Sequence, residues 1–281
     1  MKTPTVVAAD AALLPRSPNL RALAALLVLT LRQQIHGRRL LVLSLLFALP
    51  GVLAAVVSLG SRFVPPAESL EFALLLNLVP HALVPLAALL YAAGIIQDDV
   101  EEQTLTYLLL RPLPRQLLYL VKLLATLVVT SLLTAVSTAA TLAVITLVAS
   151  APATSGLVER ALKTAGLLLL AQVGYGGLFG LLGLLTRRSL VVGIVYIVLL
   201  EGLLASLDTV ARRLTVMYYF RVLVLRWLDP ASGKEWSIDL ATAPEAWTCV
   251  LTLLGVGLLL ATAAAFFFAR SEFHMKTPAG S

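Results

Sequence analysis

The stretch Gln97–Arg115 has the sequence QDDVEEQTLTYLLLRPLPR and separates two long apolar runs, Phe72–Ile96 and Leu117–Ala149. Each run is long enough to cross a bilayer, which takes about 20 mostly apolar residues in an α-helix. Charged side chains inside lipid cost kilocalories each, so the stretch between the runs has to lie outside the hydrocarbon layer. The sequence therefore predicts two transmembrane helices joined by a charged loop at a membrane surface, where a soluble partner can bind.

The composition extends this prediction to the whole chain. Hydrophobic residues make up 59% of the 281 positions and charged residues 13%, whereas an ordinary soluble domain has roughly 25% charged residues. The predicted fold class is all-α, a polytopic membrane protein with six transmembrane helices at Leu40–Leu59, Phe72–Ile96, Leu117–Ala149, Ala161–Leu185, Leu190–Leu207 and Trp247–Ala269. The net charge of +6 comes mainly from basic residues beside these spans. Such residues are signals of membrane topology, so the charge does not suggest a nucleic-acid partner.

The basic residues also predict the orientation. Six spans put both termini on one side, and that side holds 13 of the 21 Lys and Arg residues. Five of the other eight lie in one long loop, a class that counts little for orientation. We expect a cytoplasmic segment 1–39 with an interfacial helix, a transmembrane domain 40–269 and a cytoplasmic tail 270–281. Within the domain, the loop 97–116 is then cytoplasmic and the loop 208–246 extracytoplasmic.

Two shorter segments have the pattern of interfacial helices. Leu20–Leu31 is apolar but only twelve residues long, and Arg21 and Arg32 stand at its ends. It is too short to span, so we expect a helix at the headgroup level; the alternative is a disordered tail followed by a short soluble helix. Arg212–Leu228 mixes arginines with aromatic residues, which favours a helix lying at the outer interface.

No catalytic motif is visible in the chain. A Walker A sequence of the form GxxxxGK[ST] is missing, so the chain has no P-loop of its own. The three histidines show no HExxH or similar metal-ligand spacing, and no GxSxG elbow occurs. We therefore expect a protein that is not an enzyme and that binds no metal or cofactor itself.

Three of the polar residues inside predicted spans are candidates for a pathway or for packing. Glu201 is a functional candidate, because a charge at the helix centre costs about 2.5–3.5 kcal/mol, but it can also snorkel outward or pair with an arginine of the long loop. Asn77 and His81 share the second span with Pro80 and Pro85, two prolines that should kink the helix. A kinked, partly polar helix can line a pathway or serve packing, and the sequence leaves both interpretations open.

Glycines mark a predicted helix–helix contact in the fourth span. Gly176 and Gly180 form a GxxxG pair, which lets another helix approach closely. Packing is therefore the favoured interpretation of this pair, and substrate contact is the minor one.

The charged loop has the pattern of a short helix. Its carboxylates, Asp98, Asp99, Glu101 and Glu102, are predicted to lie in the first helical turn, where the helix dipole favours negative charge. A leucine-rich run follows, and the prolines after it end the helix. A solvated acidic turn would explain the charge but would leave this amphipathic helix with nothing to pack on.

The segment Ile96–Lys122 resembles the first cytoplasmic loop of ATP-binding-cassette type 2 transporter permeases. That loop has an acidic cluster, a Thr-Leu pair, a leucine run, an Arg/Ser-Pro-x-x-Arg step and a downstream lysine. Two positions depart from the family pattern, since Gln103 and Val121 replace glycines. The matching positions are held by Thr104, Leu105, Pro112, Arg115 and Lys122.

The resemblance implies the membrane subunit of an exporter in the plasma membrane, for which a bacterial inner membrane is expected. Two such subunits, as a homodimer or heterodimer, would pair with two copies of a cytoplasmic ATPase that uses ATP and Mg²⁺. The alternatives are an ion-coupled secondary transporter and a non-transporting scaffold or assembly factor, and the substrate is not predicted. The residues expected to couple the chain to the ATPase are Asp98, Asp99, Glu101, Glu102, Thr104, Leu105, Arg111, Pro112 and Arg115.

Overall fold

The computed structural model describes residues 20–60, 66–101, 114–148, 157–186, 188–203 and 210–271. Every regular element within these ranges is a helix, which confirms the predicted all-α class. Five segments are long and apolar enough to cross a membrane, and they coincide with five of the six predicted spans. They are Arg38–Leu59, Ala67–Asp99, Arg115–Leu147, Val158–Leu185 and Ala246–Arg270.

The remaining predicted span, Leu190–Leu207, is described as a shorter apolar helix, Ser189–Leu203. Its 15 residues rise about 22 Å at 1.5 Å each, less than the roughly 30 Å of the hydrocarbon layer. Residues 204–209 lie outside the described ranges. The sixth crossing therefore stays a prediction.

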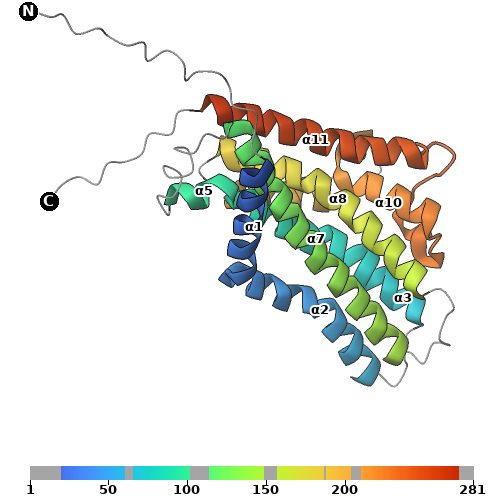
Figure 1. Cartoon of the computed structure of the whole chain (residues 1–281). Helices are drawn as coiled ribbons and strands as arrows, with labels where there is room; N and C mark the ends of the chain where they lie inside the picture. The colour runs from blue at the N-terminus through green and yellow to red at the C-terminus, as the bar shows by residue number, and fades with distance from the viewer. Residues whose placement is uncertain are drawn as a thin grey trace, which may run out of the picture.

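Long helices form a bundle in which α7 and α8 lie at the centre (Figure 1). Helix α8 packs along α11 and α4, and α7 packs along α2 and α1. Figure 1 shows α1, α5 and the C-terminal end of α11 at one end of the bundle, here called the α5 end, and α3 and α10 at the other, the α10 end. The main helices are α1 Leu20–His36, α2 Arg38–Gly60, α3 Ala67–Glu71, α4 Val84–Ala92, α5 Gly94–Glu101, α7 Arg115–Val148, α8 Leu157–Leu185, α9 Ser189–Tyr196, α10 Val216–Trp227 and α11 Ala246–Arg270.

The second span changes its helical type along its length. Its middle part, η1, is a π-helix over Phe72–Leu83, and it contains Pro80, while Pro85 lies in the first turn of α4. Proline supplies no N–H, so the regular α-helical bonding cannot continue through these positions. Pro80 thus lies in a widened helix and Pro85 directly after it, where the sequence predicted only a kink. A second π-helical segment, η2 at Ile197–Leu203, contacts η1.

The two helices predicted to lie at interfaces differ from expectation. Helix α1 has 17 residues, five more than the predicted twelve, and buries Leu26 and Thr30. Helix α10 is not a surface helix: seven of its twelve residues are buried, and it packs against α8, α11 and η1. The helix predicted within Arg212–Leu228 is therefore present, but it is packed against other helices, and its place at a membrane interface stays a prediction. Its apolar residues cover most of the helix circumference, so the helix is inserted into the bundle, with the short 3₁₀ helix η4 at Val210–Leu214 before it.

Helices α8 and α11 approach each other backbone to backbone at Gly177 and Gly257. A β-carbon on Gly177 would overlap the carbonyl oxygen of Gly257, and one on Gly257 would lie 2.8 Å from that of Val173. We therefore expect Gly177→Ala to lower the free energy of unfolding by about 1–3 kcal/mol, since the backbone has to move. Chemical unfolding in detergent micelles measures this.

Gly166 on the same helix is the matched control, because no atom lies within 4 Å of a β-carbon placed there. Gly166→Ala should leave stability unchanged or raise it slightly, as alanine favours helix. Equal effects of the two substitutions would contradict the close approach.

Candidate functional site

Helix α5 carries the first half of the acidic stretch. Asp98 and Asp99 lie in its C-terminal half, not in the first turn of a helix as predicted. The reason is that α5 already begins at Gly94, within the second span Ala67–Asp99, so these carboxylates are not at a helix N-terminus. Glu101 is the last residue of α5, and Arg115 begins α7 with an exposed side chain. The other residues of the predicted coupling set lie outside the described residues: Glu102, Thr104, Leu105, Arg111 and Pro112.

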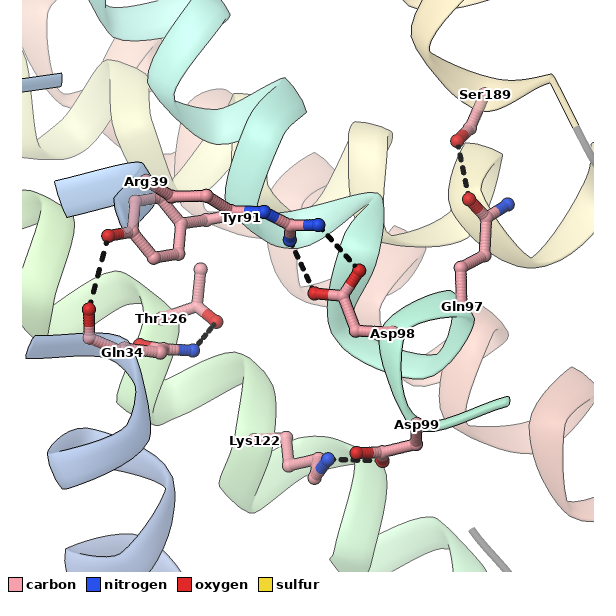
Figure 2. A network of polar contacts seen from close by, with 9 residues as sticks. All are labelled: Gln34, Arg39, Tyr91, Gln97, Asp98, Asp99, Lys122, Thr126 and Ser189. Atoms are coloured by element: carbon pink, nitrogen blue, oxygen red, sulfur yellow. Dashed lines mark hydrogen bonds and ion pairs between the residues drawn. The ribbon is translucent and has the colours of Figure 1, made fainter. Parts of the chain in front are cut away.

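Asp98 forms a two-pronged ion pair with Arg39 at the start of α2 (Figure 2). The Arg39 Nη2 atom donates to Asp98 Oδ1 over 2.8 Å, and Nη1 donates to Oδ2. The two side chains remain 49% and 36% exposed, so water weakens the attraction. This pair joins α5 to α2 at the α5 end.

Asp99 pairs with Lys122 of α7, and this pair is buried. The lysine side chain is 7% exposed and the aspartate 10%. Breaking a buried pair by removing one partner is strongly destabilising, because the remaining charge has lost its water. The pair therefore fixes α5 against α7 more firmly than Asp98 fixes it against α2.

Gln97 makes the third connection of α5, and sequence reasoning missed it. Its Nε2 donates to the carbonyl oxygens of Gly183 at 2.9 Å and Thr186 at 2.8 Å, at the end of α8. Its Oε1 accepts from Ser189 Oγ at 3.0 Å, at the start of α9 (Figure 2). Gln97 thereby satisfies carbonyls that a helix end leaves without a partner. The only signal in the sequence was an amide directly after an apolar span.

Three consecutive side chains thus connect α5 to four other helices. Gln97 contacts the ends of α8 and α9, Asp98 contacts α2, and Asp99 contacts α7. A displacement of α5 would be transmitted to all of them, because each connection is a directional polar contact.

A second polar cluster lies at the α10 end around Glu201, in η2. The Glu201 side chain is fully buried, and its oxygens accept from the backbone N–H groups of Val216 at 3.1 Å and Met217 at 3.0 Å. The Tyr196 hydroxyl donates to Glu201 Oε1 at 3.1 Å. The side chain of Thr215 accepts from the N–H of Tyr218, the next donor along the helix. The carboxylate and the threonine together satisfy the first turn of α10.

The other two polar candidates, Asn77 and His81, belong to the same end of the bundle. Asn77 Oδ1 accepts from Trp236 Nε1 over 3.2 Å. His81 lies beside η2, since a β-carbon placed on Gly202 would be 3.8 Å from His81 Nε2. The buried Arg221 of α10 stacks over the Trp236 ring, 5.5 Å from its centroid. The contacts of Asn77 and Glu201 are therefore with residues of the segment 208–246, which includes α10, and His81 lies next to them.

The GxxxG pair of α8 lies against α7. A β-carbon on Gly176 would come within 2.8 Å of the Leu127 side chain, and one on Gly180 within 2.5 Å of the Tyr119 hydroxyl. Both contacts are with side chains, whereas the neighbouring Gly177 meets backbone. Gly177, which lets α8 and α11 approach backbone to backbone, is thus one position away from the motif.

Among the described residues, no group of three or more His, Cys, Asp or Glu side chains is arranged to hold a metal ion. A comparison with protein families finds that the model of the ABC-2 family transporter protein matches residues 24–273. A comparison with curated proteins finds no match. The matched range includes both polar clusters described above.

Proposed function

The chain belongs to the ABC-2 family of transporter proteins, and from this membership we propose that it is the membrane subunit of an ATP-driven exporter. Hydrolysis would take place in a separate cytoplasmic ATPase, of which two copies would pair with two membrane subunits. The transport role itself follows from the family, and export is our proposal. The observation that supports the coupling in particular is the position of α5, which ends at Glu101 and contacts four other helices.

The proposed orientation places the α5 end in the cytoplasm. At the α10 end, five basic residues belong to the loop 208–246, a class that counts little for orientation, and Arg160 and Lys163 remain. Seven basic residues lie at the α5 end, as expected for the cytoplasmic side. They are Arg32, Arg38, Arg39, Arg115, Lys122, Arg188 and Arg270. The described chain ends, Leu20 and Ser271, lie at the same end of the bundle, which agrees with two cytoplasmic termini.

We further propose a division of labour within the acidic stretch. Asp98 and Asp99 are engaged by Arg39 and Lys122 of the same chain, so they would hold α5 to the bundle. Glu101, Glu102 and the segment up to Arg115 would then meet the ATPase. A push on this segment would reach α2 and α7 through the two ion pairs, and α8 and α9 through Gln97.

Reversing the charge of Glu101 and Glu102 to lysine tests this proposal. The membrane domain should fold as before, while retention of the co-expressed ATPase falls about tenfold or more, because like charges at an interface cost several kcal/mol. Co-purification with a co-expressed ABC-type ATPase, and the ATPase rate of the assembled complex, are the two measurements.

Charge reversal of Glu159 and Glu235 is the matched control, because both side chains are exposed and lie toward the α10 end. That variant should keep the ATPase bound and its rate unchanged. Normal binding and rate in the Glu101/Glu102 variant would refute the assigned docking segment.

A further inference from the structure

A polar cavity of about 480 Å³ lies at the α5 end, where α1 meets α2. Arg38, Arg39 and Lys122 line it together with Asp98 and Asp99, and polar side chains of α1 and Tyr91 complete the wall. Figure 2 shows the Arg39 side chain directed at Asp98 and Lys122 at Asp99, with Tyr91 beside Arg39. The volume is within the range of sites that hold small ligands.

The charge of the cavity lining is positive. Its three cations face two carboxylates, and each carboxylate already has a cation of its own, Arg39 or Lys122. Arg38 is exposed and forms no ion pair with any residue in the described ranges. An anion in the cavity would therefore meet one uncompensated guanidinium.

The surface around the cavity is apolar. Ile35, Leu41 and Val42, on either side of the α1–α2 junction, are 51%, 69% and 58% exposed. Only 22% of the most apolar window of the first span is buried. Exposed aliphatic side chains on a membrane helix face acyl chains, so the cavity lies where lipid headgroups meet tails. A ligand that fits both parts is amphipathic, with an anionic head.

We propose that this cavity binds the phosphate headgroup of an anionic phospholipid from the cytoplasmic leaflet. Arg38 would hold the phosphate, since a guanidinium matches phosphate oxygens with two parallel donors. The acyl chains would lie along the exposed face of α2 at Leu41 and Val42. Basic pockets between membrane helices on the cytoplasmic side are known to bind such headgroups.

Lipid binding to the purified chain in a delipidating detergent, measured by native mass spectrometry, tests the proposal. Phosphatidylglycerol should bind more tightly than phosphatidylcholine. Arg38→Gln should weaken phosphatidylglycerol binding about fivefold, the effect of one basic residue at a membrane surface. Arg38→Lys keeps the charge and should retain most of the affinity.

Arg32→Gln is the matched control, an exposed arginine on the last turns of α1 that does not line the cavity. It should change phosphatidylglycerol binding less than twofold. Equal binding of the two lipids, or an Arg38→Gln variant that binds like the wild-type chain, would overturn the proposal. Displacement of the lipid by soluble glycerol phosphate at matched concentration would also overturn it, by assigning the cavity to a free phosphate compound. No ATPase enters the assay, so failure here is separate from failure of the proposed transport role.

Discussion

Replacing Lys122 by methionine is expected to lower the free energy of unfolding by about 3–5 kcal/mol. The substitution removes the cation that faces the Asp99 carboxylate, and that carboxylate is only 10% exposed. Methionine fills a similar volume, so the loss comes from the missing charge and not from a cavity. Chemical unfolding in detergent micelles gives the value directly.

Two further variants separate this effect from general damage. Arg39→Gln breaks the more exposed pair with Asp98 and should cost about 1 kcal/mol or less. The double variant Asp99→Asn with Lys122→Met removes both charges and should recover most of the lost stability, because no buried charge remains. If the Lys122→Met and Arg39→Gln variants unfolded at the same denaturant concentration, the Asp99–Lys122 pair would contribute no more than the exposed pair, which would contradict its burial.

The same double variant bears on coupling. If the Asp99–Lys122 pair transmits motion from α5 to α7, the refolded double variant should bind the ATPase normally but show altered ATPase rates. A purely structural role for the pair predicts an unchanged rate. Stability and coupling are thereby measured on one protein.

Membrane spans were predictable because lipid imposes a simple length rule. An uninterrupted run of about 20 apolar residues has few other uses, and five such runs appear in the structure as long helices. The length rule could not predict that η1 is a π-helix. That depends on which donors bind the backbone carbonyl groups that Pro80 leaves without a helical hydrogen bond. The rule also could not place α10 inside the bundle. A helix of twelve residues with aromatic and basic side chains has the same composition whether it lies at a membrane interface or within a bundle.

The partners of the acidic stretch could not be predicted from local patterns. Asp98 lies 59 positions from Arg39, and Asp99 lies 23 positions from Lys122. Nothing in the spacing specifies such pairs, since they depend on how three helices meet at one end of the bundle. The sequence did indicate that charge there needs a partner, and it suggested the ATPase as that partner. The structure places two of the carboxylates on cations of the same chain.

Glu201 shows the same limit at the other end of the bundle. Its depth predicted a compensating partner, and an arginine of the outer loop was one expectation. The hydrogen-bond partners in the structure do belong partly to that loop, but they are the backbone N–H groups of Val216 and Met217. A backbone partner has no residue-type signature, so no sequence pattern could identify it.

Removing the Glu201 carboxylate is the second substitution with a large expected effect. Glu201→Ala leaves two buried N–H groups of α10 without an acceptor, at about 1–3 kcal/mol each. We expect stability to fall by about 2–6 kcal/mol in total and the amides of Val216 and Met217 to exchange hydrogen faster. Unfolding in micelles and hydrogen exchange of the 216–218 region measure the two effects. Glu159→Gln, at an exposed carboxylate, should change neither.

Glu201→Gln then distinguishes an anchor of α10 from a proton carrier. An amide has one acceptor oxygen, so it can replace one of the two backbone bonds, and about half of the stability loss should remain. A proton-carrying residue in an ion-coupled transporter would instead show near-normal stability in this variant, together with transport that no longer responds to a pH gradient. Stability that follows the number of acceptor oxygens, from glutamate through glutamine to alanine, supports the anchor. That order would also weaken the secondary-transporter alternative, because Glu201 is the main intramembrane acid on which that alternative depends.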